Sequence, residues 1–166
     1  DSNEKGHQTM VEEACQIALK KANVKQNDVD FLMSGDLVNQ MTPSNFAAAT
    51  LQVPYIGLFS ACATAVSSVI IASLLTELGG SRYALAGAGS QHNSVERQFR
   101  YPVEYGGQKP GTAQWTVTAA GYVLIAKGQM NSPAVEAATI GKLIGLRQTD
   151  PFQMGAAMAP AACDTL

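Results

Sequence analysis

Charged residues are scarce in this sequence. Asp, Glu, Lys and Arg make up 14% of its 166 residues, and the formal net charge at pH 7 is −2. Because nucleic-acid binding depends on a basic surface that neutralises phosphates, this balance argues against DNA or RNA as a partner. Few charges also leave apolar surface open to water, so we expect a partner subunit or another part of the same protein to cover some of it.

The sequence also lacks a hydrophobic run long enough to cross a bilayer. Its longest apolar-leaning stretch, 61–78, contains three serines, two threonines and a glutamate, which makes it too polar for a spanning helix. The opening residues Asp-Ser-Asn-Glu-Lys do not have the pattern of a signal peptide. We therefore expect neither direct membrane insertion nor a secretory leader.

Cysteine and histidine are too sparse for the common disulfide and metal frameworks. The three cysteines, Cys15, Cys62 and Cys163, show no C-x-x-C or Cys/His spacing, and their odd number argues against a set of disulfides. We expect no metal and no cofactor, and a reducing compartment is the simpler setting.

The residues that are present alternate between helical and strand patterns over one domain's length. Gly79-Gly80 is typical of a helix end, and Thr9 is a candidate N-cap for the first helix. The alternation predicts an α/β fold with layered helices and a mixed, mostly parallel sheet that ends in an antiparallel hairpin. The expected strands are 29–34, 55–59, 83–89, 115–126 and 135–146. The expected helices are 10–22, 46–51 with a helix start at Thr42-Pro43-Ser44, and 63–78.

A long polar segment, 90–112, separates the third strand from the predicted hairpin. Loops of this length inside a compact domain are usually functional or disordered. Phe99, Tyr101 and Tyr105 supply apolar area that would order the segment, so we predict a functional loop.

Cys62 lies between an apolar strand-like run and the small-residue start of a helix-like run. Amide groups at a helix N-terminus favour a negative charge, so a thiol at such a turn suits a nucleophile or the anchor of an anionic ligand. The alternative is a buried cysteine that acts as a small hydrophobe.

The two histidines differ in position. His92 follows the strand 83–89 at its carboxyl end, the side where open α/β sheets place ligands and where Cys62 is also expected. The two residues could form a Cys/His pair or share a pocket wall, or His92 could be a surface residue without a role. His7 lies in a polar N-terminal segment, where we expect it to face solvent.

Several blocks of sequence are familiar in combination. They resemble one half of a thiolase-fold protein and, more narrowly, the stage V sporulation protein AD family of spore-forming bacteria. The block 96–113 is long and unusual, whereas a cysteine at this turn is shared by ketoacyl synthases and thiolases generally. The blocks that carry the resemblance are 34–40 (SGDLVNQ), 58–64 (LFSACAT), 90–93 (SQHN), 96–102 (ERQFRYP), 104–113 (EYGGQKPGTA) and 158–162 (MAPAA).

The resemblance implies a non-enzymatic protein that binds dipicolinic acid, pyridine-2,6-dicarboxylate, and supports its movement into the developing spore with other proteins of the same operon. It implies a homodimer and a location in the spore cytoplasm or at the periphery of the spore inner membrane, and calcium is an open question as a companion of the ligand. It also implies that residues 1–148 form a first thiolase-like half without its opening strand. Residues 149–166 would begin the second half, in a helix with Thr149 or Asp150 as cap and Pro151 at its start.

The predicted ligand-binding residues are Cys62, His92, Arg97, Arg100 and Lys109. A guanidinium can hold a carboxylate through two parallel hydrogen bonds, which suits a flat dicarboxylate. The alternative for the arginines is a set of ion pairs with the loop's own glutamates.

Three further interpretations remain. Asp36 and Asn39 also follow a strand, and turn and cap chemistry is the favoured interpretation for them. The chain could be an acyltransferase or β-ketoacyl synthase relative with Cys62 as the acyl-carrying nucleophile. It could also be a structural subunit of a membrane-associated assembly.

Overall fold

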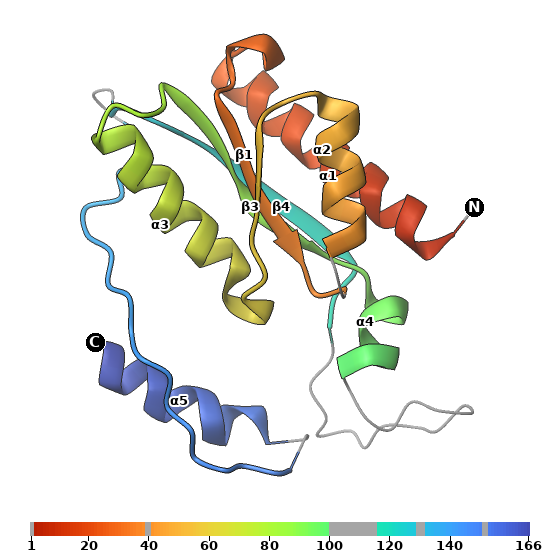
Figure 1. Ribbon diagram of the computed structural model, residues 1–166, viewed down its shortest axis with the longest axis vertical. Helices are drawn as coiled ribbons and strands as arrows, with labels where there is room; N and C mark the ends of the chain where they lie inside the picture. Colours follow the sequence, from red (N-terminus) through yellow and green to blue (C-terminus); the bar gives the residue numbers. More distant parts are fainter. Residues whose placement is uncertain (1, 39–40, 100–115, 129–131, 151–152) are drawn as a thin grey trace.

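A four-stranded sheet lies between two helical layers in the computed structural model of this chain (Figure 1). The structure describes residues 2–38, 41–99, 116–128, 132–150 and 153–166, with the backbone but not the side chains of 96–99. Helices α1 and α2 cover one face of the sheet and α3 covers the other. The strands are β1 (Phe31–Asp36), β2 (Tyr55–Gly57), β3 (Tyr83–Ser90) and β4 (Ala119–Ala126), in the order β2-β1-β3-β4.

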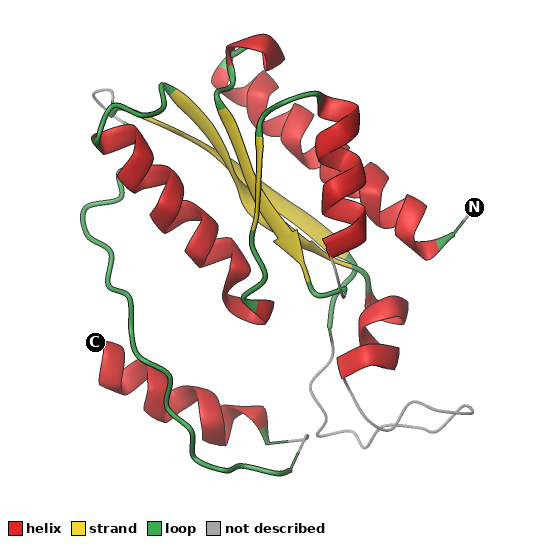
Figure 2. Ribbon diagram, viewed as in Figure 1, coloured by secondary structure: helices red, strands yellow, loops and turns green. Residues whose placement is uncertain are grey.

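Among the described residues, one helix precedes the first strand, three lie between successive strands, and one follows the last strand near the C-terminus (Figure 2). They are α1 (Asn3–Ala22), α2 (Thr42–Leu51), α3 (Thr64–Glu77), α4 (His92–Phe99) and α5 (Met154–Thr165), with short 3-10 turns η1 (Gln26–Asp28) and η3 (Ala61–Ala63).

The strand pairing confirms the predicted class. β1 pairs in parallel with β2 and β3, and β3 pairs antiparallel with β4. The predicted hairpin is wrong, because the antiparallel partner of β4 is β3 and residues 135–146 form no strand. Gly141 and Gly145 weaken a strand interior, and the run passes α3 instead, where residues 139–143 line a cavity with that helix.

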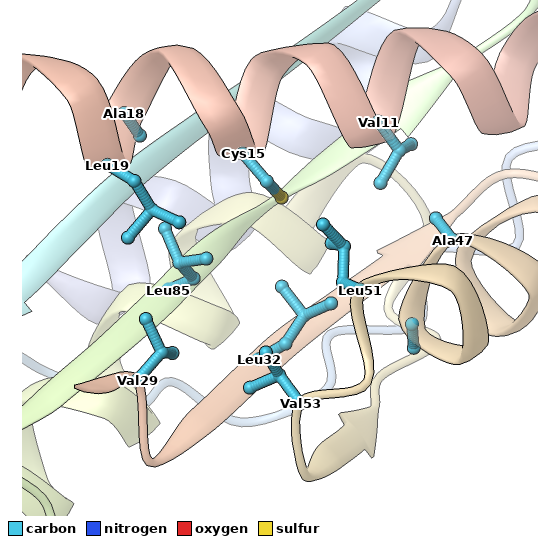
Figure 3. Close-up of a cluster of buried hydrophobic side chains, with 11 residues drawn as sticks. Val11, Cys15, Ala18, Leu19, Val29, Leu32, Ala47, Leu51, Val53 and Leu85 are labelled. Atoms are coloured by element: carbon cyan, nitrogen blue, oxygen red, sulfur yellow. The ribbon is translucent and has the colours of Figure 1, made fainter. Parts of the chain in front are cut away.

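Side chains alternate between the two faces of the central strands, as strand geometry requires. Leu32 and Leu85 pack toward α1 and α2, whereas Met33, Ala84 and Ala86 pack toward α3. Figure 3 shows the first of these clusters, in which Cys15 of α1 is enclosed by hydrocarbon. Burial raises the pKa of the Cys15 thiol to about 12, so this cysteine is a packing residue and not a nucleophile.

The sequence pattern predicted a helix that begins at Met10, but helix α1 begins at Asn3. Ser2 is the N-cap, and its Oγ accepts a hydrogen bond from the Lys5 amide at 3.2 Å. Thr9 is inside the helix, and its hydroxyl donates to the Lys5 carbonyl at 3.0 Å. Polar residues and a glycine with poor helix propensity concealed these first turns in the sequence.

The observed ends of the other helices and strands differ from the predicted ends by fewer residues. β1 is Phe31–Asp36 rather than 29–34. The predicted helix start at Thr42-Pro43-Ser44 is confirmed, because α2 begins at Thr42 with Pro43 in its first turn. The end of α3 is as predicted: Gly79 has a φ of +77°, and the Gly80 amide donates to the Leu75 carbonyl at 2.8 Å.

The predicted loop 90–112 and the predicted C-terminal helix also differ from the structure. Residues 92–99 of the predicted loop form helix α4, while 100–112 lie outside the described residues. The predicted C-terminal helix exists as α5, but it begins at Met154 with Gln153 as its cap, and Pro151 lies outside the described residues.

Candidate functional site

Cys62 occupies the turn η3, between β2 and the start of α3, and its side chain is exposed. The prediction of a cysteine at a strand-to-helix turn is therefore confirmed, and the alternative of a buried small hydrophobe is wrong. An exposed thiol at this position is accessible to a ligand or to a reagent.

The backbone of this turn is strained and held in place by a buried threonine. Ala61 has a φ of +46°, in the left-handed region that costs a residue with a Cβ about 1–2 kcal/mol. The Thr64 hydroxyl accepts a hydrogen bond from the Ser60 amide at 3.0 Å and donates to the Ala61 carbonyl at 2.8 Å. Thr64 is 0% exposed, so these bonds fix the turn that presents Cys62.

The turn also needs a glycine in the neighbouring strand. A Cβ added to Gly35 of β1 would lie 1.8 Å from the Leu58 carbonyl oxygen and 2.9 Å from Cγ2 of Thr64. Only a residue without a side chain lets the chain between β2 and η3 approach β1 so closely.

A cavity of about 580 Å³ begins at the residues that flank Cys62, a volume within the range of small-molecule sites. Most of its lining is apolar, and Lys142 is the one charged residue among the described residues that line it. Lys142 forms an exposed ion pair with Asp164 at 3.2 Å. The lining residues are Leu58, Ser60, Ala63, Val66, Ser67, Ile70, Ile71 and Thr139 to Leu143.

Sequence reasoning missed this cavity because one of its walls comes from a distant segment. Residues 139–143 were predicted to be part of a strand, so Lys142 was not a candidate. Val66, Ile140 and Leu143 are exposed apolar residues, and exposed apolar surface is the signal that indicates a binding cavity between this irregular segment and the helix.

His92 is the first residue of α4, directly after β3 and Gln91. Its Nδ1 lies 3.0 Å from the Thr116 carbonyl oxygen, and its backbone amide donates to the Thr118 hydroxyl at 3.0 Å. Nδ1 also lies 3.1 Å from the Thr116 hydroxyl, so it can donate to the carbonyl or accept from the hydroxyl, depending on the tautomer. The pairing of His92 with Cys62 remains a prediction.

The predicted cationic residues cannot be located in the site. Arg97 lies in α4, but its side chain is outside the described part of the chain, and Arg100 and Lys109 are outside it entirely. Their role in ligand binding therefore stays a prediction, as does the alternative of ion pairs within the loop.

Asp36 serves as a turn and cap residue, as interpreted from the sequence. Its Oδ1 accepts from the Val38 amide at 2.9 Å, and its Oδ2 accepts from the Ser44 amide at 3.2 Å and the Ser44 hydroxyl at 2.8 Å. Asn39 lies outside the described residues. The prediction for His7 is wrong: the side chain is 0% exposed, because α1 begins early enough to place it against the sheet.

Neither a metal-binding cluster nor a membrane-spanning helix occurs in the ranges that the structure describes. No three His, Cys, Asp or Glu side chains gather there as a metal site would require. Within the same ranges, every helix is too short or too polar to cross a bilayer.

The fold resembles that of condensing enzymes. It matches 3-oxoacyl-[acyl-carrier-protein] synthase III from Aquifex aeolicus VF5 with a TM-score of 0.63 at 15% identity, covering 82% of this chain and 43% of that chain. The tetronic acid condensing enzyme AbyA1 matches with a TM-score of 0.59 at 25% identity, covering 82% and 42%. These likenesses show the thiolase-like fold.

The sequence matches a family model directly. Residues 1–166 match stage V sporulation protein AD, and the chain is 45% identical over 163 residues to the protein of that name from Bacillus subtilis (strain 168). That alignment covers 98% of this chain and 48% of the relative, so the chain spans about half the relative's length. The chain belongs to the stage V sporulation protein AD family.

Proposed function

We propose that this chain binds dipicolinic acid without catalysing a reaction, and that the binding supports uptake of the acid into the developing spore. Membership of a sporulation family supplies the biological setting. The observation that carries the proposal is the cavity of about 580 Å³ beside the exposed Cys62 turn.

The chemistry of the cavity suits a small aromatic anion. Leu58, Ile70 and Ile71 offer apolar surface to a flat ring. Ser60 and Ala63 line the cavity at the start of α3, where the positive end of the helix dipole favours a carboxylate.

Further positive charge is needed for a dicarboxylate. Lys142 belongs to the cavity lining, and its ion pair with Asp164 is exposed and weak enough to exchange for a ligand carboxylate. We propose that His92 and the cationic residues Arg97, Arg100 and Lys109 hold the second carboxylate.

The proposal extends to partners and location. We expect a homodimer that works with other proteins of the same sporulation operon, and dipicolinate bound with or without calcium. The location that fits these partners is the developing spore, in its cytoplasm or at the periphery of its inner membrane.

Isothermal titration of the intact protein with dipicolinate tests the proposal. We expect saturable heat, and a dissociation constant about tenfold or more weaker in Lys142→Ala and Arg97→Ala, because each removes a charge-assisted hydrogen bond. Lys127→Ala is the matched control, since this lysine lies outside the cavity lining. Picolinate, with one carboxylate, should bind more weakly than dipicolinate, and a folded protein that gives no heat with dipicolinate would contradict the proposal.

Acyl transfer is a second candidate function, favoured by the exposure of Cys62 on a strained turn. In that reaction the Cys62 sulfur would attack the carbonyl carbon of an acyl-CoA thioester, and the coenzyme A thiolate would leave as the new C–S bond forms. His92 or a base outside this chain would accept the thiol proton. Mass spectrometry of the intact protein after incubation with acyl-CoA would show the acyl group on Cys62 if this function holds. A protein that neither binds dipicolinate nor becomes acylated would be a structural subunit.

A further inference from the structure

His7 is a buried histidine without a hydrogen-bond partner among the residues that the structure describes. The side chain is 0% exposed, and neither Nδ1 nor Nε2 has a donor or acceptor within reach. The ring lies directly against the end of β3, because a Cβ on Gly89 would be 2.4 Å from Nε2. Such a ring is tolerated while it is neutral, but a positive charge on it would be expensive without water.

Asp36 is the charged group that acts on His7 among the described residues. Its backbone pairs with Gly89 in the sheet register, so the carboxylate and the imidazole belong to the same end of the sheet. Asp36 is 1% exposed, and both of its oxygens already accept hydrogen bonds from residues of the following turn and α2. The negative charge of Asp36 therefore favours protonation of His7, but no hydrogen bond joins the two side chains.

The other elements around α1 supply hydroxyl groups and one histidine. Burial raises the pKa of Tyr122 of β4 and of Tyr55 of β2, to about 12 for Tyr55, and the charge of Asp36 adds to both shifts. The α2 helix contributes the Ser44 hydroxyl and β3 the Ser90 hydroxyl, whose oxygen is buried without a partner. Helix α4 also contacts α1, and among its described side chains the titratable one is His92, which is held by Thr116.

We propose that His7 makes the docking of the first turns of α1, residues 3–11, sensitive to pH: when the imidazole takes up a proton, these turns detach from the sheet while the rest of the domain stays folded. This is a conformational device separate from ligand binding at the Cys62 turn.

The sign of the effect follows from burial. Desolvation, opposed by the charge of Asp36, holds the His7 pKa below its usual value of 6.5 in the docked state. A detached His7 regains the ordinary pKa and binds a proton more readily, so the docked state loses stability as the pH falls below about 6.5. The change is at most tenfold in the docking equilibrium per pH unit for one proton.

Asp36 acts in the opposite direction at lower pH. Burial raises its pKa above the usual 3.8, against the hydrogen bonds from Ser44 and Val38, so the docked state binds this proton more readily. Protonation of Asp36 therefore restores stability as the pH falls toward 3.8, and the detachment should be greatest in mild acid.

Detachment would uncover a limited region. Gln8 ties α1 to α2 through a hydrogen bond from its Nε2 to the Thr50 hydroxyl at 3.1 Å, and this bond would be lost. The α4 helix, where Val95 is 1% exposed, contacts α1 and would also lose cover. Acid would thus expose the end of the sheet where β1 and β3 finish.

Hydrogen–deuterium exchange of the intact protein between pH 7.5 and 5.5 tests this proposal, with protection corrected for the intrinsic pH dependence of exchange. We expect protection of a peptide from residues 3–11 to fall between threefold and tenfold per pH unit below about 6.5, while α3 keeps its protection. His7→Leu should remove the pH dependence, whereas Lys5→Gln, a charge change on the exposed side of the same turns, should keep it.

A second measurement keeps the test independent of variants. The ring protons of His7 in the wild-type protein, followed by NMR, should titrate together with the loss of α1 protection. Unchanged protection of residues 3–11, an equal loss in α1 and α3, or a rise in protection as His7 is protonated would each overturn the proposal. The last result would mean that a stable ion pair forms with Asp36.

Discussion

Replacing Thr64 with valine tests how the Cys62 turn is held. Valine keeps the shape of threonine but removes a hydroxyl that accepts from the Ser60 amide at 3.0 Å and donates to the Ala61 carbonyl at 2.8 Å. Each hydrogen bond contributes about 0.5–1.5 kcal/mol net, so the loss is about 1–3 kcal/mol. Since Ser60 and Ala61 are exposed, water can solvate the freed groups and the cost should lie toward the lower end of this range.

The strain at Ala61 predicts a second effect of Thr64→Val. Without the hydroxyl, the left-handed conformation at Ala61, which costs about 1–2 kcal/mol, is no longer enforced and the turn should relax. We expect urea unfolding to show the loss of stability and dipicolinate titration to show weaker binding than in the wild type. Thr64→Ser, which keeps the hydroxyl, should retain most of the affinity.

Thr76→Val is the matched control for this experiment. Thr76 lies on the same helix and is 4% exposed, but its hydroxyl has no hydrogen-bond partner within the described part of the chain. Removing an unsatisfied buried hydroxyl should leave stability unchanged or increase it, and binding should be unaffected. Equal effects of Thr64→Val and Thr76→Val on stability and affinity would refute the reasoning about the turn.

Two further predictions follow from close contacts and burial. Gly35→Ala should destabilise the protein by about 1–3 kcal/mol or more in urea unfolding, because its Cβ would lie 1.8 Å from the Leu58 carbonyl oxygen. Gly121→Ala, with nothing within 4 Å of its Cβ, should change stability far less, and the opposite order would contradict the packing argument. In the native protein at pH 8, iodoacetamide should modify Cys62 and leave Cys15 unreacted, since a pKa of about 12 leaves roughly one in ten thousand of the Cys15 thiols ionised. Equal modification rates would contradict this assignment.

The fold class was predictable because strand and helix patterns are local. Apolar runs before Gly35 and after Arg82 become β1 and β3, and Gly79 ends α3 where its backbone freedom is needed. The prediction of a strand at 135–146 was wrong. The residue types of this segment favour a strand, but in the fold the segment lies beside α3. A strand forms only where a neighbouring strand can pair with it, and a single sequence does not show which strands are neighbours.

The candidate site was predictable in part for a similar reason. The position of Cys62 at a strand-to-helix turn was predictable from the adjacent residues, whereas its exposure was left open between two alternatives. The cavity could not, because Lys142 approaches this helix from a segment distant in sequence. The burial of His7 was also hidden, since it depends on a helix start that the polar residues around Gly6 conceal.

Protection of Cys62 by dipicolinate is the most direct test of the central claim that the cavity beside this turn binds the ligand. The rate of iodoacetamide modification would be measured for Cys62 and for Cys163, the other exposed cysteine, over a series of dipicolinate concentrations. We predict that the Cys62 rate falls to a plateau as the site fills, while the Cys163 rate stays constant. A Cys62 rate that does not change at any concentration, in a protein whose titration with dipicolinate gives no heat, would contradict the account.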